Sequence, residues 1–173
     1  ILKKSEKDKA ELLMIVDLER HDLATICQTG TVSVSDYRLI EEYSHVFHSV
    51  STVEGQLQNN ISHVDAFKAL FPGGSVTGAP KIRSMEIIHE LETVPRQLYT
   101  GAIGYFGFNN KTMFNLAIRT MYSHAKRLMF HAGGGIVADS DGHCEWEETQ
   151  IKAKGMLDTL FQDELKTEPA ILS

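Results

Sequence analysis

A stretch rich in glycine and proline constrains this chain more than any other part of it. Between Phe71 and Lys81 the sequence places three glycines, two prolines, one serine and one threonine. Glycine permits positive φ angles and close approach of the backbone to a ligand, and proline suits the first turn of a helix. Helical patterns run up to this stretch and leave it from Pro80. The sequence therefore predicts a rigid loop that leads into a helix N-terminus.

Two interpretations of this loop are open. Exposed amides at a helix N-terminus, the helix dipole and the ammonium group of Lys81 would together favour an anion. The same composition also suits an ordinary connection between two helices. Composition alone does not choose between them.

The bulk composition is that of a soluble globular protein with a core of useful size. The chain has 173 residues, of which 42% are hydrophobic and 23% are charged. Its net charge of -6 argues against a general nucleic-acid binder, which would present a basic surface. Cys27 and Cys144 give neither a disulfide framework nor a metal-ligand spacing, so we expect buried thiols and a reducing, cytoplasmic compartment. No apolar run approaches the roughly 18 residues of a membrane span.

Hydrophobic periodicity predicts an α+β fold with antiparallel strands. The predicted helices cover residues 5–29, 62–70, 81–92 and 142–164, and the predicted strands cover 31–34, 39–53, 99–108, 112–122 and 127–132. Ser5 and Ser62 are expected to cap the first two helices. Turns are expected at residues 36–37 and 109–111.

Two side-chain placements follow from the same patterns. In the third predicted helix, Ile82 and Leu91 belong to a face that we expect to lie inward. In the first helix, Asp17 follows an apolar run and is the charged residue least suited to a solvated position, whereas Asp22 is counted with the surface charges.

A few polar residues and glycines are candidates for binding a ligand or a metal ion or for catalysis. Arg119 is expected in the middle of a strand with apolar neighbours, where it needs an anionic partner, either an internal carboxylate or a ligand. Residues 133–135 are glycines at a strand end, which suits close approach of amides or a bulge. Glu145 and Glu148 share one helix face, as surface charge or as oxygen ligands for Mg²⁺. His48 lies in a predicted strand, where histidine is more often structural than catalytic.

Short motifs along nearly the whole chain occur in a characteristic order. They are residues 8–18, 43–48, 71–81, 101–105, 118–120, 132–140 and 145–149. Together they resemble the chorismate-utilising enzymes: anthranilate synthase component I, aminodeoxychorismate synthase component I, and the isochorismate and salicylate synthases. The resemblance implies an α+β fold of the α/β-sandwich type, in which helices cover an antiparallel sheet.

Within that family, the forms of residues 71–81 and 132–137 look most like aminodeoxychorismate synthase component I. The segment 43–46, Tyr-Ser-His-Val, is familiar from anthranilate synthase component I, which is the next closest. The implied reaction replaces the 4-hydroxyl of chorismate with ammonia, which a glutamine amidotransferase subunit would supply. The product, 4-amino-4-deoxychorismate, leads to p-aminobenzoate and folate, whereas the anthranilate alternative leads to tryptophan. An alternative of another class is a non-catalytic remnant or binding module.

The resemblance also implies a set of site residues. One Mg²⁺ ion would hold a chorismate carboxylate and would itself be bound by Glu11, Glu145 and Glu148. The enolpyruvyl carboxylate would be bound by Arg119 and Tyr105 with the amides of Gly134 and Gly135. Ser75 would wall the ring pocket, and His48 matches a position near the leaving hydroxyl, with an acid–base or polarising role.

One departure from the family pattern affects the expected activity. The family carries a Pro-Ile-Lys-Gly-Thr or Pro-Ile-Ala-Gly-Thr segment before the motif that contains Glu11, and this chain has no such segment. A lysine there would favour the aminodeoxychorismate product and an alanine the anthranilate product. We therefore expect residues 1–165 to be the C-terminal part of a single chorismate-binding catalytic domain, inactive or nearly so alone. Residues 166–173 are expected to be a disordered tail.

Overall fold

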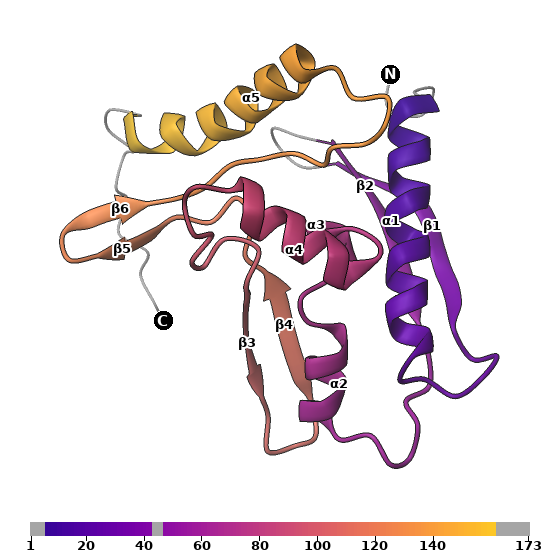
Figure 1. Cartoon of the computed structure of the whole chain (residues 1–173). Helices are drawn as coiled ribbons and strands as arrows, with labels where there is room; N and C mark the ends of the chain where they lie inside the picture. Colours follow the sequence, from indigo (N-terminus) through magenta and orange to yellow (C-terminus); the bar gives the residue numbers. More distant parts are fainter. Residues whose placement is uncertain (1–5, 43–46, 162–173) are drawn as a thin grey trace. The chain divides into compact units, whose positions relative to one another are not determined.

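The computed structural model describes residues 6–42 and 47–161, and the chain divides into two compact units. The first unit contains Ile1–Pro95 and Gly104–Met113, and the second contains Arg96–Ile103 and Phe114–Ser173. Both combine helices with strands (Figure 1), in agreement with the predicted α+β class. The predicted single domain over residues 1–165 stays a prediction, and the predicted tail lies outside the described residues.

Five helices and six strands make up the described part of the chain. The helices are α1 (Glu6–Ala24), α2 (His63–Leu70), α3 (Gly74–Thr77), α4 (Lys81–Leu91) and α5 (Gly142–Phe161). The strands are β1 (Ser33–Glu42), β2 (Phe47–Glu54), β3 (Ala102–Phe106), β4 (Thr112–Leu116), β5 (Tyr122–His124) and β6 (Arg127–Met129). Among the described residues they form three two-stranded sheets, β1–β2, β3–β4 and β5–β6.

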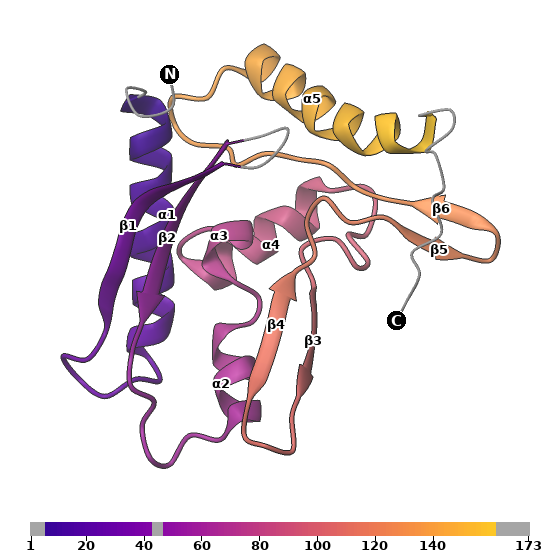
Figure 2. The same ribbon diagram turned by 180° about the vertical axis from the view of Figure 1, so that it is seen from behind.

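Helix α1 lies along the β1–β2 hairpin, which covers it in the view from behind (Figure 2). The helix ends at Ala24 rather than at the predicted Thr29. Residues 26–28 instead pair with residues 56–58, because Gln28 N–H donates to the Gln56 carbonyl at 2.8 Å and Gln58 N–H donates to the Ile26 carbonyl at 3.0 Å. A contact distant in sequence thus overrides the local helical pattern. The predicted Ser5 cap lies outside the described residues.

The β1–β2 hairpin corrects the prediction of a turn at residues 36–37. Strand β1 continues through them, with irregular register between Val34 and Asp36 and between Asp36 and Leu39. Arg38 takes a φ of 57°, and its N–H donates to Ser51 Oγ at 3.0 Å. Each irregularity places one extra residue on β1, which is the geometry of a β-bulge. The residues expected to form a turn therefore bulge the strand without ending it.

Helix α2 forms where it was predicted. Ser62 is its N-cap, and its hydroxyl accepts a hydrogen bond from Asp65 N–H at 3.2 Å. The helix also contacts the β3–β4 hairpin. The ring of Phe67 packs edge to face on that of Phe106 of β3, with 6.0 Å between ring centroids, and His63 Nδ1 lies 2.6 Å from Thr112 Oγ1 of β4. These contacts hold α2 against the turn end of the β3–β4 hairpin.

The hairpin turn at residues 109–111 is also confirmed. Gly107 N–H donates to the Lys111 carbonyl at 2.8 Å, and Asn110 takes the left-handed φ of 59° that suits asparagine in such turns. Strand β6 pairs with β5 and not with β4, so the strand predicted over residues 127–132 belongs to a separate hairpin. Helix α5 begins at Gly142 as predicted.

Burial is limited among the described residues. Val16, Ile26 and Cys27 are buried in the first unit, and Ala117 and Met156 in the second.

Two predictions of burial are wrong. The face of α4 that was expected to lie inward is exposed, with Ile82 76% exposed and Leu91 74% exposed. The thiol of Cys144, expected to be buried, is exposed as well. Periodicity identifies an apolar face but not whether another element covers it. No helix of the described part of the chain has both the length and the apolar character needed to cross a membrane.

The junction between α1 and β2 generates a test of this packing. A Cβ at Gly55 would lie 2.8 Å from Cys27 Sγ and 3.2 Å from a methyl group of Val32. We expect Gly55→Ala to lower the free energy of unfolding by about 1–3 kcal/mol, because the buried thiol has to move. Chemical denaturation of the 173-residue chain measures the change.

The matched control is Gly155→Ala, in the interior of α5, where a Cβ would meet nothing within 4 Å. Alanine favours a helix over glycine by about 0.5–1 kcal/mol, so this variant should be neutral or more stable. Equal stability of the Gly55→Ala variant and the unmodified chain would contradict the described packing.

Candidate functional site

The glycine-proline stretch forms an ordered loop that contains a single helical turn. Helix α2 stops before Phe71, α3 occupies Gly74–Thr77, and α4 begins at Lys81 with Pro80 as its N-cap. Gly78 takes a φ of 112°, and a Cβ there would lie 2.8 Å from Ser84 Oγ. Glycine is therefore required at this turn, as predicted for a loop of this composition.

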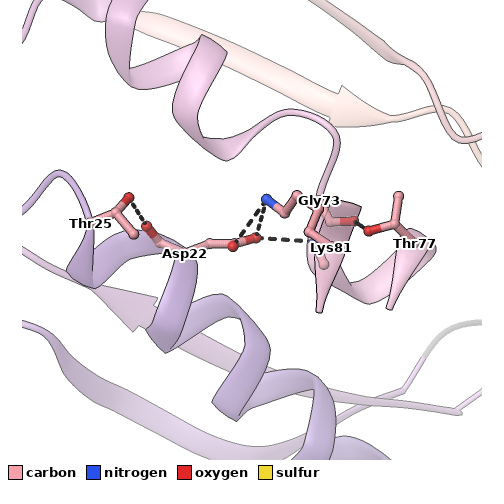
Figure 3. A network of polar contacts seen from close by, with 6 residues as sticks. Asp22, Thr25, Gly73, Thr77 and Lys81 are labelled. Carbon is pink, nitrogen blue, oxygen red and sulfur yellow. Dashed lines mark hydrogen bonds and ion pairs between the residues drawn. The ribbon is translucent and has the colours of Figure 1, made fainter. Parts of the chain in front are cut away.

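The ammonium group of Lys81 is committed to an internal partner. Asp22, near the end of α1, places its carboxylate 3.0 Å from Lys81 Nζ, and the same carboxylate accepts a hydrogen bond from Gly74 N–H at 3.1 Å (Figure 3). Asp22 is only 7% exposed, which corrects its expected surface position. Asp17, expected to be the less solvated of the two, is exposed and pairs with Arg20.

Four of the predicted site residues belong to the first unit: Glu11 on α1, His48 on β2, Ser75 on α3 and Tyr105 on β3. Ser75 is half-buried, and no hydrogen bond joins its hydroxyl to another described residue. Tyr105 is 54% exposed and Glu11 is also exposed. The backbone of His48 pairs with Glu41 across the hairpin, whereas its side chain lies outside the described part.

Arg119 belongs to the second unit and is not in a strand. Ala117 makes the last ladder contact, since its N–H donates to the Gly101 carbonyl at 2.9 Å, and Ile118 N–H then donates back to Leu116 at 2.9 Å. This tight turn leaves Arg119 exposed with a φ of 49°. No carboxylate of the described residues forms an ion pair with it, so the internal-partner alternative has no support there.

Gly133 and Gly134 lie against α5, whereas a Cβ at Gly135 would meet nothing within 4 Å. A Cβ at Gly134 would lie 3.3 Å from Glu145 Oε2 and 3.8 Å from Lys152 Nζ. Lys152 Nζ also donates to the Gly133 carbonyl at 3.3 Å and lies 2.6 Å from Glu148 Oε1. The structure thus brings Gly134, Glu145 and Glu148 together, with Lys152 as a cation that was not among the predicted site residues.

Lys152 could have been found from the sequence. It follows Glu148 by four positions, the spacing at which opposite charges meet on a helix. The pairing of Asp22 with Lys81 carries no such signal, because 59 residues separate them.

The carboxylates of α5 suit a hard divalent cation in their chemistry. Glu145 and Glu148 are half-buried on one helix face and offer oxygen donors of the kind that Mg²⁺ takes. Among the described residues no three histidine, cysteine, aspartate or glutamate side chains are grouped closely enough to hold a metal ion. Glu11 belongs to the first unit and the α5 pair to the second, so the three-carboxylate site stays a prediction.

Helix α5 is set in place by two capping contacts. Asp141 Oδ1 accepts from Cys144 N–H at 3.0 Å and from His143 N–H at 3.1 Å. Ser140 Oγ donates to Glu145 Oε1 at 2.8 Å, which orients that carboxylate. The amide of Cys144 holds the pKa of Asp141 below its ordinary value of 3.8. These contacts fix the direction in which Glu145 leaves the helix.

Comparison with known proteins gives these residues a context. A model of the chorismate binding enzyme family matches residues 1–158. Aminodeoxychorismate synthase component 1 of Bacillus subtilis (strain 168) is 47% identical over 164 residues, which cover 95% of this chain and 35% of the relative. Anthranilate synthase component 1 of Acinetobacter calcoaceticus is 47% identical over 152 residues, 88% of this chain and 31% of that protein.

A solved structure shares the fold. The crystal structure of anthranilate synthase component I from Streptococcus pneumoniae TIGR4 superposes with a TM-score of 0.81 at 44% sequence identity, over 90% of this chain and 36% of that chain. The chain therefore spans about a third of the length of the curated relatives it matches.

The start of α5 yields a prediction of pH dependence. Because the folded pKa of Asp141 is lowered, its stabilisation is present above the unfolded value of 3.8 and is lost as the pH falls through the folded pKa. Asp141→Ala should therefore lower the melting temperature of the chain at about pH 7 and have a smaller effect at about pH 3.

Asp141→Asn is the matched control, because asparagine also caps a helix N-terminus but does not titrate. Its melting temperature should be close to that of the unmodified chain at about pH 7. An Asp141→Ala effect of the same size at both pH values would contradict a stabilising role of the ionised carboxylate.

Proposed function

The chain belongs to the chorismate-binding enzymes, and from this membership we propose that it is the C-terminal part of the catalytic domain of an enzyme like aminodeoxychorismate synthase component 1. The proposed reaction replaces the C4 hydroxyl of chorismate with ammonia and gives 4-amino-4-deoxychorismate. The observation that carries the proposal is the arrangement on α5 of Glu145 and Lys152 against Gly133 and Gly134, with Glu148 paired to Lys152.

Chorismate is a small dianion, and the proposed binding groups match that charge. The exposed guanidinium of Arg119 can form two parallel hydrogen bonds with a carboxylate, and Tyr105 can donate another. The amides of Gly134 and Gly135 would donate to the same group, because a glycine strip permits close approach. Half-buried Ser75 would contribute its hydroxyl to the wall of the ring pocket.

The remaining roles concern the leaving group. We assign Mg²⁺ to Glu11, Glu145 and Glu148, where the bound ion would neutralise a substrate carboxylate and favour departure of the C4 hydroxyl by withdrawing charge. His48 would move or hold a proton near that hydroxyl. Lys152 balances Glu148 in the described structure, so it keeps the carboxylate pair from being an uncompensated negative cluster.

The alternative product is anthranilate, and a specific observation supports it. The anthranilate synthase relative is as similar as the aminodeoxychorismate synthase relative, at 47% identity each. The names of both relatives, component 1, indicate enzymes of more than one component. We propose that the partner of this chain is a glutamine amidotransferase subunit that supplies ammonia.

Product analysis tests the proposed reaction. The whole polypeptide that carries this chain is incubated with chorismate, Mg²⁺ and an ammonium salt, and the products are separated and identified by mass spectrometry. 4-Amino-4-deoxychorismate supports the proposal and anthranilate supports the alternative. Absence of both products together with absence of Mg²⁺-dependent chorismate binding would indicate a binding module or a remnant without catalysis.

Substitution of Arg119 tests the substrate site. We expect Arg119→Ala to weaken chorismate binding at least about 10-fold, because a charged bidentate contact is lost. Equilibrium titration with chorismate measures the change, and the melting temperature should stay close to that of the unmodified protein since the side chain is exposed. Arg127→Ala, at an exposed arginine of β6, is the matched control. Equal affinity of the Arg119→Ala and Arg127→Ala variants would remove Arg119 from the site.

Substitution of Glu148 tests the metal site. Glu148→Gln should raise the Mg²⁺ concentration needed for half-maximal chorismate binding at least about 10-fold, because an anionic ligand becomes neutral. Glu147→Gln, one residue away on an exposed part of α5, is the control and should leave the titration unchanged. An unaltered Mg²⁺ titration of the Glu148→Gln variant would show that Glu148 is not a ligand.

A further inference from the structure

We propose that Asp22 is a positioning residue for Ser75, because its buried carboxylate holds the beginning and the end of the loop that carries this serine. The inference rests on the proposed role of Ser75 in the pocket wall. The loop attachment itself can be measured without chorismate, so failure of one can be told from failure of the other.

The geometry at Asp22 is that of a latch between distant segments. Its Oδ2 accepts from Gly74 N–H at 3.1 Å and from Lys81 Nζ at 3.1 Å, and Oδ1 lies 3.0 Å from the same Nζ (Figure 3). Gly74 is the first residue of α3 and Lys81 is the first residue of α4. One carboxylate therefore fixes both ends of the segment 74–81 relative to α1.

The segment between these ends has little freedom left. Gly78 N–H donates to the Gly74 carbonyl at 2.8 Å, and Thr77 Oγ1 donates to the Gly73 carbonyl at 2.9 Å, which closes the single turn of α3. A Cβ at Gly74 would lie 3.4 Å from Asp22 Oδ2 and 3.5 Å from Leu18 Cβ, so the turn packs closely on α1. Ser75 directly follows Gly74, and its position is set by that contact.

The charges make the two partners interdependent. Asp22 is nine-tenths or more buried and the Lys81 side chain is 26% exposed. Removing one member of such a pair leaves the other as an uncompensated charge in a poorly solvated place, whereas removing both charges together avoids this. Asparagine at position 22 would keep an oxygen acceptor for Gly74 N–H, so the charge and the hydrogen bond can be separated.

Amide hydrogen exchange of the full chain tests the latch. In Asp22→Asn, which replaces the charged acceptor of Gly74 N–H by a neutral one, and in Lys81→Met, which leaves the buried Asp22 carboxylate without its cation, the amides of residues 74–78 should exchange about 10-fold to 100-fold faster. The double variant Asp22→Asn with Lys81→Met should exchange more slowly than Lys81→Met alone, because neither charge is then left unpaired. Asp17→Asn, which breaks the exposed pair with Arg20 on the same helix, should leave these amides unchanged.

The positioning role is tested by chorismate affinity in the same variants of the whole polypeptide. Asp22→Asn and Lys81→Met should each raise the KM or Kd for chorismate about 10-fold and leave the Mg²⁺ requirement unchanged. In the double variant the chorismate affinity should recover. Ser75→Ala should weaken binding by a similar factor and should add little to Asp22→Asn, since both act on one contact.

Three outcomes would overturn the proposal. Unchanged exchange of residues 74–78 in both single variants would show that there is no latch. Faster exchange with unchanged chorismate affinity would show that the latch does not position a binding group. An unchanged affinity of the Ser75→Ala variant would remove Ser75 from the pocket, and the positioning role of Asp22 with it, while the exchange rates would still report the latch.

Discussion

The geometry of the first unit depends on one buried carboxylate. Asp22 joins α1 to residues 52 and 59 positions further along the chain, and it does so with two kinds of donor, a backbone amide and an ammonium group. A backbone N–H at the start of a helical turn has no partner within that turn, and a charge-assisted acceptor is a strong way to satisfy it. The loop rich in glycine and proline is thus ordered from outside, by a residue of another element.

In the second unit the central charged group is an ammonium group, that of Lys152, instead of a carboxylate. Helix α5 brings Glu145 close to Gly134, and Lys152 Nζ pairs with Glu148 and donates to the Gly133 carbonyl. The ion pair of Lys152 with Glu148 is partly exposed, so water screens its two charges. The local contacts of Asp141 and Ser140 hold the start of helix α5 and the Glu145 carboxylate in place.

Features that depend on neighbouring residues could be predicted from the sequence. The Ser62 cap, the hairpin turn at residues 109–111 and the start of α5 at Gly142 each follow from side chains within a few positions of the feature. The facing of Glu145 and Glu148 follows from helical spacing in the same way.

Features that depend on distant contacts were predicted wrongly or not at all. Helix α1 ends early because residues 26–28 pair with residues 56–58. Burial of Asp22 has no local pattern, since its partners are supplied by a loop far along the chain. The exposure of the apolar face of α4 was not predicted either, because periodicity identifies an apolar face but not whether another element packs on it.

The division into units has a practical consequence in the β3–β4 hairpin. The chain passes from one unit to the other three times, after Pro95, within β3 after Ile103 and within β4 after Met113. No single cut of the polypeptide can therefore release either unit as a continuous piece. A protease nick after Ile103 would leave residues of both units on each fragment, whereas a nick after Pro95 or after Met113 would leave one fragment with residues of a single unit.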